Sequence, residues 1–166
     1  MLASMRWLQQ YVEIPMTPEE LADRLTRVGL EVEQVIHLGE GLDGVVTGKL
    51  VKVEKHPQSD HLLICQVDVG EEKPLQILTG APNVHENDIV PVALVGAHLP
   101  GGKVIQDVKM AGYDSAGMCC SAEELGIDAK LLLPEQRNGL YILPDTTPLG
   151  VDVKAYLGLD DVVLDI

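Results

Sequence analysis

The sequence predicts a mainly β protein in which a small five-stranded barrel is inserted into a small α/β unit. Five short runs that are β-branched or alternate in polarity, each bounded by Gly, Pro, Asn or Asp, lie between residues 45 and 120, and such runs are typical of a small barrel. Helix-like and strand-like segments stand at both ends of the chain, and the termini of one small unit can flank a larger inserted domain. We therefore expect an α/β unit at residues 1–38 and 151–166, with the barrel at 39–150.

Residues 1–38 carry the signals of two helices and a strand. Ser4 can cap a short helix, and Thr17-Pro18-Glu19-Glu20 supplies an N-cap, a proline at the first helical position and a Glu three residues after the cap. Gly29 ends the second helix, and residues 30–37 alternate like a half-buried strand. The first helix places Trp7, Leu8, Tyr11 and Val12 on one face, which we expect to be core, and the second has an apolar stripe at Leu21, Leu25 and Val28.

A unit of this size rarely buries enough surface to be stable alone, so its apolar face is expected to pack on something else. At the other end of the chain, the pattern predicts a helix opening at Pro148 and a strand at residues 160–166. We expect this last strand to pair with residues 30–37.

The barrel strands are expected at residues 45–55, 61–70, 74–80, 88–96 and 106–120. Leu99-Pro100-Gly101-Gly102 is typical of a turn. Ser121-x-x-Glu124 has the spacing of a capping box, which predicts a short helix after the fifth strand. Residues 140–144 can add an edge strand.

The charge of the chain argues against strong binding of a polyanion. Twelve Lys and Arg against 26 Asp and Glu give a net charge of −14, whereas nucleic-acid modules usually present a basic surface. Aromatic residues are scarce, and only Tyr113 lies where a ring could stack on a base. Any contact with nucleic acid is therefore expected to be local or weak.

The sequence offers no candidate for catalysis or metal binding. His56, His61, His85 and His98 and the three cysteines lack metal-ligand spacing, and no phosphate loop, nucleophile elbow or paired carboxylates stand out. We expect no catalytic residue and no metal site. No apolar run approaches the ~20 residues of a membrane span, no secretory signal begins the chain, and three cysteines fit a reducing cytoplasm.

Two segments of the barrel region resemble a known family. They are VEKHPQSDHLLICQVDVGEE at Val53–Glu72 and GAPNV at Gly80–Val84, the latter followed by VPVALVGAHLPGG and KMAGYDSAGMCCSAEELGI. Together they resemble the tRNA-binding domain shared by phenylalanine-tRNA ligase β subunits and some methionyl-tRNA synthetases. The opening, with Ser4, Trp7, Leu8 and TPEELADRLTRVGLEVEQV, is similar to the N-terminal domain of the bacterial phenylalanine-tRNA ligase β chain.

The resemblance implies an OB-fold barrel and an accessory role in attaching phenylalanine to tRNA. It implies tRNA as a partner, an α subunit that holds the aminoacylation site in an (αβ)₂ assembly, ATP and Mg²⁺ for the whole ligase, and no cofactor for this chain. The residues expected to contact tRNA are Lys49, Lys52, Lys55, His56, Ser59, Asn83, Lys109, Ser115 and Ser121. His61 and Ala111 stand where strongly binding members often have basic residues, which implies weak binding.

Two alternatives remain open at the level of sequence. A free-standing, structure-specific tRNA-binding protein could use the same barrel, although the TPEELADRL segment argues against it. The barrel could also be purely a structural and assembly module, a view that the net charge of −14 supports.

Overall fold

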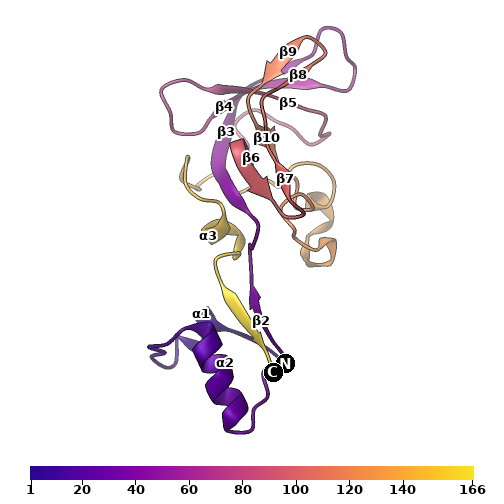
Figure 1. Cartoon of the computed structure of the whole chain (residues 1–166). Helices are drawn as coiled ribbons and strands as arrows, with labels where there is room; N and C mark the ends of the chain where they lie inside the picture. Colours follow the sequence, from indigo (N-terminus) through magenta and orange to yellow (C-terminus); the bar gives the residue numbers. More distant parts are fainter. The chain divides into compact units, whose positions relative to one another are not determined.

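A computed structural model describes all 166 residues and divides the chain into two compact units. Unit 1 consists of residues 1–40 and 154–166, and unit 2 of residues 41–153. Both appear in Figure 1, coloured along the sequence. The structure is mostly β, as the sequence predicts.

Unit 1 is built on a three-stranded antiparallel sheet in the order β1-β11-β2. The strands are β1 (Leu2–Ser4), β11 (Val162–Asp165) and β2 (Gln34–His37). The predicted pairing of the C-terminal strand with residues 30–37 is confirmed, with Val162 opposite His37 and Leu164 opposite Val35. The observed strand begins only at Gln34, and sequence patterns gave no sign of β1.

Three helices complete unit 1: α1 (Met5–Leu8), α2 (Pro18–Arg27) and α3 (Lys154–Leu157). The predicted capping box of α2 forms, because Thr17 Oγ1 accepts from the Glu20 amide at 3.2 Å and Glu20 Oε2 accepts from the Thr17 amide at 3.0 Å. The helix predicted to open at Pro148 forms only at Lys154–Leu157, so its predicted start was wrong. In unit 2, Thr47 N donates to Val151 O at 2.9 Å and Val153 N to Val45 O at 3.1 Å, so the segment before Lys154 is held along a strand.

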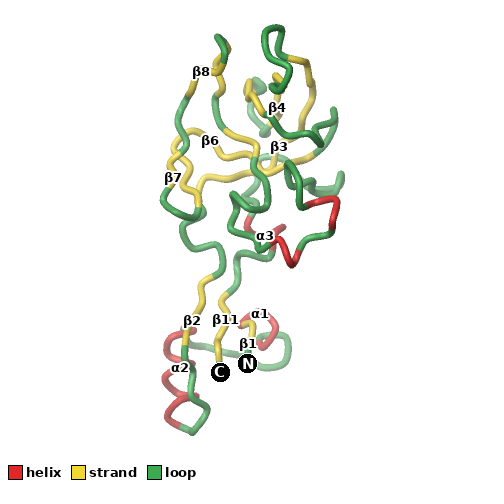
Figure 2. The backbone as a smooth tube through the Cα atoms, turned by 90° about the vertical axis from the view of Figure 1, so that its right-hand side faces the viewer, coloured by secondary structure: helices red, strands yellow, loops and turns green.

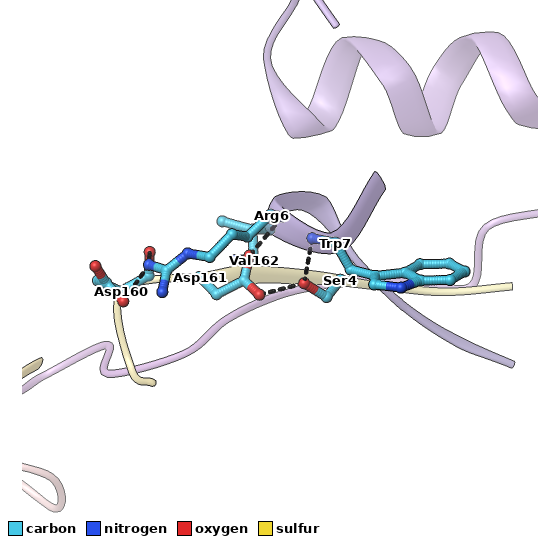
Figure 3. A network of polar contacts seen from close by, with 6 residues as sticks. All are labelled: Ser4, Arg6, Trp7, Asp160, Asp161 and Val162. Atoms are coloured by element: carbon cyan, nitrogen blue, oxygen red, sulfur yellow. Dashed lines mark hydrogen bonds and ion pairs between the residues drawn. The ribbon is translucent and has the colours of Figure 1, made fainter. Parts of the chain in front are cut away.

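A polar network fixes the start of α1 against the turn before β11 (Figure 3). Ser4 Oγ accepts from the Trp7 amide at 3.0 Å as N-cap and donates to Asp161 Oδ2. Asp161 Oδ1 accepts from the amides of Arg6 at 3.1 Å and Val162 at 2.8 Å. Burial would raise the pKa of Asp161, but these three hydrogen bonds outweigh it and lower the pKa.

The predicted core face of the first helix is solvent-exposed, so that expectation was wrong. Trp7 is 53% exposed, Tyr11 74% and Val12 56%. The helix ends at Leu8, and Trp7 and Tyr11 contact each other edge to face at 5.4 Å. In the second helix, Leu21 and Leu25 are half-buried and no residue of α2 is fully buried. Much of the apolar surface of unit 1 is therefore not buried within unit 1 itself.

Unit 2 is an OB-fold-like barrel whose sheet has the order β10-β6-β3-β4-β5. Figure 2 shows its strands in yellow, with β3, β4 and β6 labelled. Its strands are β3 (Asp43–Lys55), β4 (Leu63–Asp68), β5 (Leu75–Thr79), β6 (Ile89–Leu99) and β10 (Met118–Cys119), with β7 (Lys103–Val104) paired to β6. The turn predicted at Leu99-Pro100-Gly101-Gly102 joins β6 to β7. The first four strands lie where the sequence predicts them.

The fifth predicted strand, 106–120, is not one strand. It forms a hairpin of β8 (Val108–Met110) and β9 (Tyr113–Ser115), followed by β10. Gly117 has a φ of +135°, and a Cβ there would lie 2.7 Å from Ala93 O, so the chain turns where only glycine fits. The hairpin end meets β5, since Ala116 N donates to Gln76 O at 2.9 Å.

Two smaller predictions in unit 2 were also wrong. Ser121 and Glu124 form the predicted capping box, but only a turn follows, at residues 122–126. Residues 140–144 form one isolated bridge, between Leu143 and Ile89, in place of a strand. The 3₁₀ helices η1 (Ala129–Leu131) and η2 (Pro134–Gln136) lie between these segments.

The barrel core contains the three cysteines as ordinary apolar residues. Cys65 and Cys120 have no exposed surface and Cys119 is 4% exposed. Burial raises the pKa of Cys65 to about 11 and of Cys120 to about 12, and raises that of Cys119 well above its usual range. All three thiols are free and protonated at neutral pH.

Replacing Asp161 with Asn should destabilise unit 1 by about 1 kcal/mol near pH 7, since the network includes the N-cap of α1. Because the pKa of Asp161 is lowered, its contribution is fully present above the ordinary value near 3.8 and is lost as the pH falls further, through the lowered pKa of the folded state. Thermal unfolding of wild type and variant, followed by the fluorescence of Trp7, the single tryptophan, should differ at about pH 7 and converge as the pH falls through this lowered pKa. Asp145→Asn in an exposed loop is the control; an equal loss there would contradict the network's role.

The three thiols should resist alkylation while unit 2 is folded. A thiol of pKa about 11 is a thiolate in about one molecule in a thousand at pH ~8, and burial blocks access as well. Iodoacetamide labelling read by mass spectrometry should leave the native chain unmodified and label it fully in urea. Labelling of the native chain at the rate of a small free thiol would refute this.

Candidate nucleic-acid interface

Unit 2 has a pocket of about 310 Å³ at one end of its barrel, which we call the end pocket. Its walls come from the end of β5, the tip of β8, β10, the turn after β10 and residues 139–140. The lining residues are Leu62, Leu78, Thr79, Gly80, Ala81, Met110, Met118, Cys119, Ser121, Glu124, Gly139 and Leu140. The pocket is thus mainly apolar, with hydroxyl groups and a single carboxylate as its polar side chains.

His56 connects the end of β3 to the β8–β9 hairpin. It is 4% exposed; its Nδ1 accepts from the Gln58 amide at 3.0 Å, and its Nε2 lies 3.1 Å from Ala111 O. This pattern requires the neutral ring with the proton on Nε2, which donates to Ala111. The ring also contacts Tyr113 edge to face at 4.8 Å. The imidazole is buried and both of its nitrogens are engaged, so the predicted contact of His56 with tRNA stays a prediction.

Ala111 accommodates this contact in a left-handed conformation with a φ of +46°. Its carbonyl is thereby the acceptor for His56, at the tip of the hairpin that carries Met110 into the end pocket. His56 therefore fixes a wall of the pocket.

Asn83 and Ser115 also serve as supports. The Asn83 amide donates to Leu140 O at 2.9 Å and accepts from Leu140 N at 2.8 Å. Ser115 is 1% exposed; its Oγ accepts from Leu78 N at 3.0 Å and donates to Gly117 O at 3.2 Å. Leu140 and Leu78 both line the pocket, so these residues shape its walls and do not present polar groups to a ligand.

Ser121 and Glu124 line the pocket together with Thr79, the third polar side chain there. Glu124 Oε2 accepts from Ser121 N at 2.7 Å and lies 3.0 Å from Ser121 Oγ. Ser59 lies in the loop beside the end of β3, where its Oγ accepts from the His61 amide at 3.3 Å. The Ser59 side chain is half-buried and holds its own loop.

The four predicted lysines do not form one patch. A bulge between Leu50 and Lys52 shifts the register of β3 against β4, so that Lys49 lies opposite Asp68 and Lys52 opposite Gln66 on the same side of the strand. Lys52 is exposed and pairs with Glu54 at 2.9 Å. A binding role for these two lysines is thus weakened by neighbouring carboxylates.

Lys55 and Lys109 lie nearer the end pocket. Lys55 is exposed and immediately precedes His56, and Lys109 precedes the pocket residue Met110. Lys109 Nζ lies 3.7 Å from Asp114 Oδ1, with both side chains exposed, and such an exposed pair contributes little. Among the predicted residues, these two lysines are the cations nearest in sequence to the pocket, and Lys103 also reaches it, with its Nζ 3.6 Å from Sδ of the lining residue Met118.

Sequence reasoning missed the apolar part of the site. The sequence gives no signal that separates Leu62, Met110 and Met118 from core residues. Met110 reaches the pocket through a hairpin whose position depends on His56. Within unit 2, eight Lys and Arg against 16 Asp and Glu give a net charge of −8. The end pocket therefore favours an apolar or neutral group such as a base, while the surrounding field opposes a polyanion.

The structure contains no group of three or more His, Cys, Asp or Glu side chains that could hold a metal ion. None of its helices has the length and apolar character needed to cross a membrane.

Sequence similarity to known proteins extends over both units of the chain. The family described as "Putative tRNA binding domain" matches residues 45–152. The phenylalanine-tRNA ligase β subunit of Moorella thermoacetica is 52% identical over 159 residues, which is 96% of this chain and 20% of that protein. The corresponding β subunit of Clostridium acetobutylicum is 48% identical over 165 residues, 99% of this chain and 20% of that protein.

A looser structural likeness links the chain to a MetRS related protein from Pyrococcus horikoshii. It has a TM-score of 0.46 and 20% identity and covers 64% of this chain and 85% of that chain. The sequence matches are the stronger finding, and in them the chain spans about a fifth of the length of the curated relatives. The chain thus belongs to the tRNA-binding-domain family and is homologous, over both of its units, to the N-terminal region of bacterial phenylalanine-tRNA ligase β subunits.

Proposed function

We propose that this chain is the N-terminal part of a phenylalanine-tRNA ligase β subunit and that its barrel makes an accessory contact with tRNA. The observation that carries the proposal is the match of about 50% identity through both units, including the N-terminal segment outside the tRNA-binding domain. In this role the chain has no catalytic residue of its own. The aminoacylation site, ATP and Mg²⁺ belong to the whole ligase, an (αβ)₂ assembly with the α subunit in the cytoplasm.

The end pocket supports a defined mode of contact. Its apolar lining and volume of about 310 Å³ suit an unstacked base, since single-stranded bases are recognised by stacking on apolar or aromatic surfaces. Lys55 and Lys109 lie beside it and can each neutralise a phosphate. Two cations in a unit of charge −8 support a weak contact, which becomes useful once tRNA is held elsewhere, because a tethered second contact acts at high effective concentration.

The alternatives are less well supported. The free-standing tRNA-binding protein is disfavoured because the match extends through unit 1 and the relatives are several times longer than the chain. A purely structural role for the barrel requires that the end pocket and its two lysines have no effect on tRNA. The following measurement decides between these roles.

Charge reversal at the pocket should weaken tRNA binding more than charge reversal elsewhere. We expect the chain to bind labelled tRNA with a Kd of about 10⁻⁴ M or weaker at ~150 mM salt. At lower salt, where binding is measurable, Lys55→Glu with Lys109→Glu should reduce the affinity and lower the salt slope by about one per lysine.

Lys73→Glu with Lys130→Glu is the matched control, because it changes the net charge equally at exposed positions that do not flank the end pocket. Equal loss in both double variants would leave only a long-range charge effect and support the purely structural role. Sub-micromolar binding by the wild-type chain would overturn the accessory role and point to a primary one.

His56→Phe tests whether the buried imidazole positions the hairpin. Phenylalanine keeps the ring contact with Tyr113 but removes both hydrogen bonds, each of which contributes about 1 kcal/mol. Amides of residues 108–115 should exchange faster, and tRNA affinity should fall although no charge is removed. His85→Phe, at a position whose side chain is 79% exposed, should leave both readouts unchanged; unaltered hairpin exchange in the His56 variant would refute the positioning role.

A further inference from the structure

Unit 2 has a second pocket, of about 260 Å³, directly beside the end pocket, and we call it the side pocket. The two pockets share three lining residues, Leu78, Met110 and Met118, so these side chains form a common wall. Most of the remaining lining comes from the segment 103–108, which includes β7 and the first residue of β8. Figure 2 shows β7 and β8 in the same part of unit 2 as β6.

Hydrogen bonds to β6 hold the segment 103–108 in place. Gly96 N donates to Ile105 O at 2.7 Å, and Ile105 N donates to Ala97 O at 2.9 Å. The Ile105 side chain is buried, whereas Val104 and Val108 are each 44% exposed and also line the side pocket. The side pocket therefore has a backbone fixed by the barrel and an apolar edge open to solvent.

Lys103 places a positive charge at the common wall of the two pockets. It lines the side pocket, and its Nζ lies 3.6 Å from Sδ of Met118 in that wall. Unlike Lys52 and Lys109, Lys103 has no carboxylate partner. Because a thioether is only a weak hydrogen-bond acceptor, the ammonium group of Lys103 keeps its charge available to a ligand.

Two small apolar pockets with a cation at their common wall match the chemistry of two successive nucleotides. A base presents a flat face that stacks on side chains, and the phosphate that joins two nucleotides carries the negative charge that Lys103 complements. The volume of about 260 Å³ lies below the ~300–1,000 Å³ of pockets for drug-sized ligands, which suits a single base. Methionine adapts its shape and makes favourable contacts with rings, so Met110 and Met118 can separate two bases. An apolar peptide would leave Lys103 without a complementary charge.

We propose that the end pocket and the side pocket together bind two successive unpaired nucleotides, with one base in each pocket and the linking phosphate on Lys103. The proposal rests on the proposed function and deepens it, since it names an unpaired dinucleotide as the part of tRNA that the barrel contacts. A base inside a duplex must be extruded before it can enter a pocket. The site therefore selects single-stranded parts of the tRNA.

The test uses the methionine methyl groups as reporters in NMR titrations of the 166-residue chain at low salt. The probes are adenosine and the dinucleotide ApA, which differ by one base and its linking phosphate. ApA should bind about tenfold more tightly or more than adenosine. It should shift the methyl signals of Met110 and Met118 and leave those of the other three methionines, Met1, Met5 and Met16 in unit 1, unchanged.

Two pairs of variants test the side pocket and its cation separately. Val104→Asp, which changes the side pocket alone, should weaken ApA binding about tenfold, while Val95→Asp, at a 49% exposed position that lines neither pocket, should bind like wild type. Lys103→Ala should weaken ApA binding about tenfold and leave adenosine binding unchanged, because adenosine has no phosphate. Lys73→Ala, at an exposed position outside both pockets, should change neither.

Three results would overturn the two-nucleotide site. They are ApA binding no more tightly than adenosine, equal losses in Val104→Asp and Val95→Asp, and a loss of adenosine binding in Lys103→Ala as large as the loss of ApA binding. A shift of the Met118 methyl signal on addition of the ligase α subunit, without nucleotide, would assign the two pockets to a protein interface and so also overturn the proposal.

These outcomes are separate from those of the tRNA titration. If Lys55→Glu with Lys109→Glu weakens tRNA binding as expected while ApA binds no better than adenosine, the proposed function stands and the two-nucleotide site falls. If neither tRNA nor ApA binds, both proposals fall.

Discussion

The organisation of the chain depends on the way Thr47 binds the segment that leaves the barrel. Its backbone donates to Val151 O at 2.9 Å and accepts from Gly150 N at 2.8 Å, and its Oγ1 accepts from Val151 N at 3.3 Å. Thr47 is fully buried and Val153 donates to Val45 O in the same ladder. The entry to unit 2 and the exit from it are thereby held side by side. This closure allows two separate chain segments to supply β2 and β11 of one sheet.

The sequence could predict the features that depend on local chemistry. The capping box of Thr17 and Glu20, the first four barrel strands and the pairing of the last strand with residues 34–37 follow from polarity period, turn residues and cap spacing. The helix expected from Pro148 begins only at Lys154, because residues 150–153 pair with β3. The strand expected at 106–120 is broken twice, at Gly112 and Gly117, which both have positive φ. Such outcomes depend on contacts distant in sequence.

Several of the predicted site residues hold backbone in the structure. His56, Asn83 and Ser115 were predicted as polar groups available to a ligand, and each uses its polar atoms to hold backbone around the end pocket. A motif in one sequence does not distinguish a residue that shapes a site from one that contacts a ligand. The bulge between Leu50 and Lys52, which brings Lys49 and Lys52 to the same side of β3, cannot be read from an alternating run.

The two units differ in how completely their apolar side chains are buried. Unit 2 has a core of fully buried residues including Leu50, Val67, Ile77 and Val92, and no buried side-chain nitrogen or oxygen in the chain lacks a hydrogen-bond partner. The packing of unit 2 itself is therefore enough to hold the walls of the end pocket. Unit 1 satisfies its polar groups through the Ser4–Asp161 network but leaves an apolar groove beside Trp7 and α2 open. Polar satisfaction fixes geometry while apolar burial supplies most of the stabilisation. The proposed contact with tRNA therefore lies in the unit whose own core is complete.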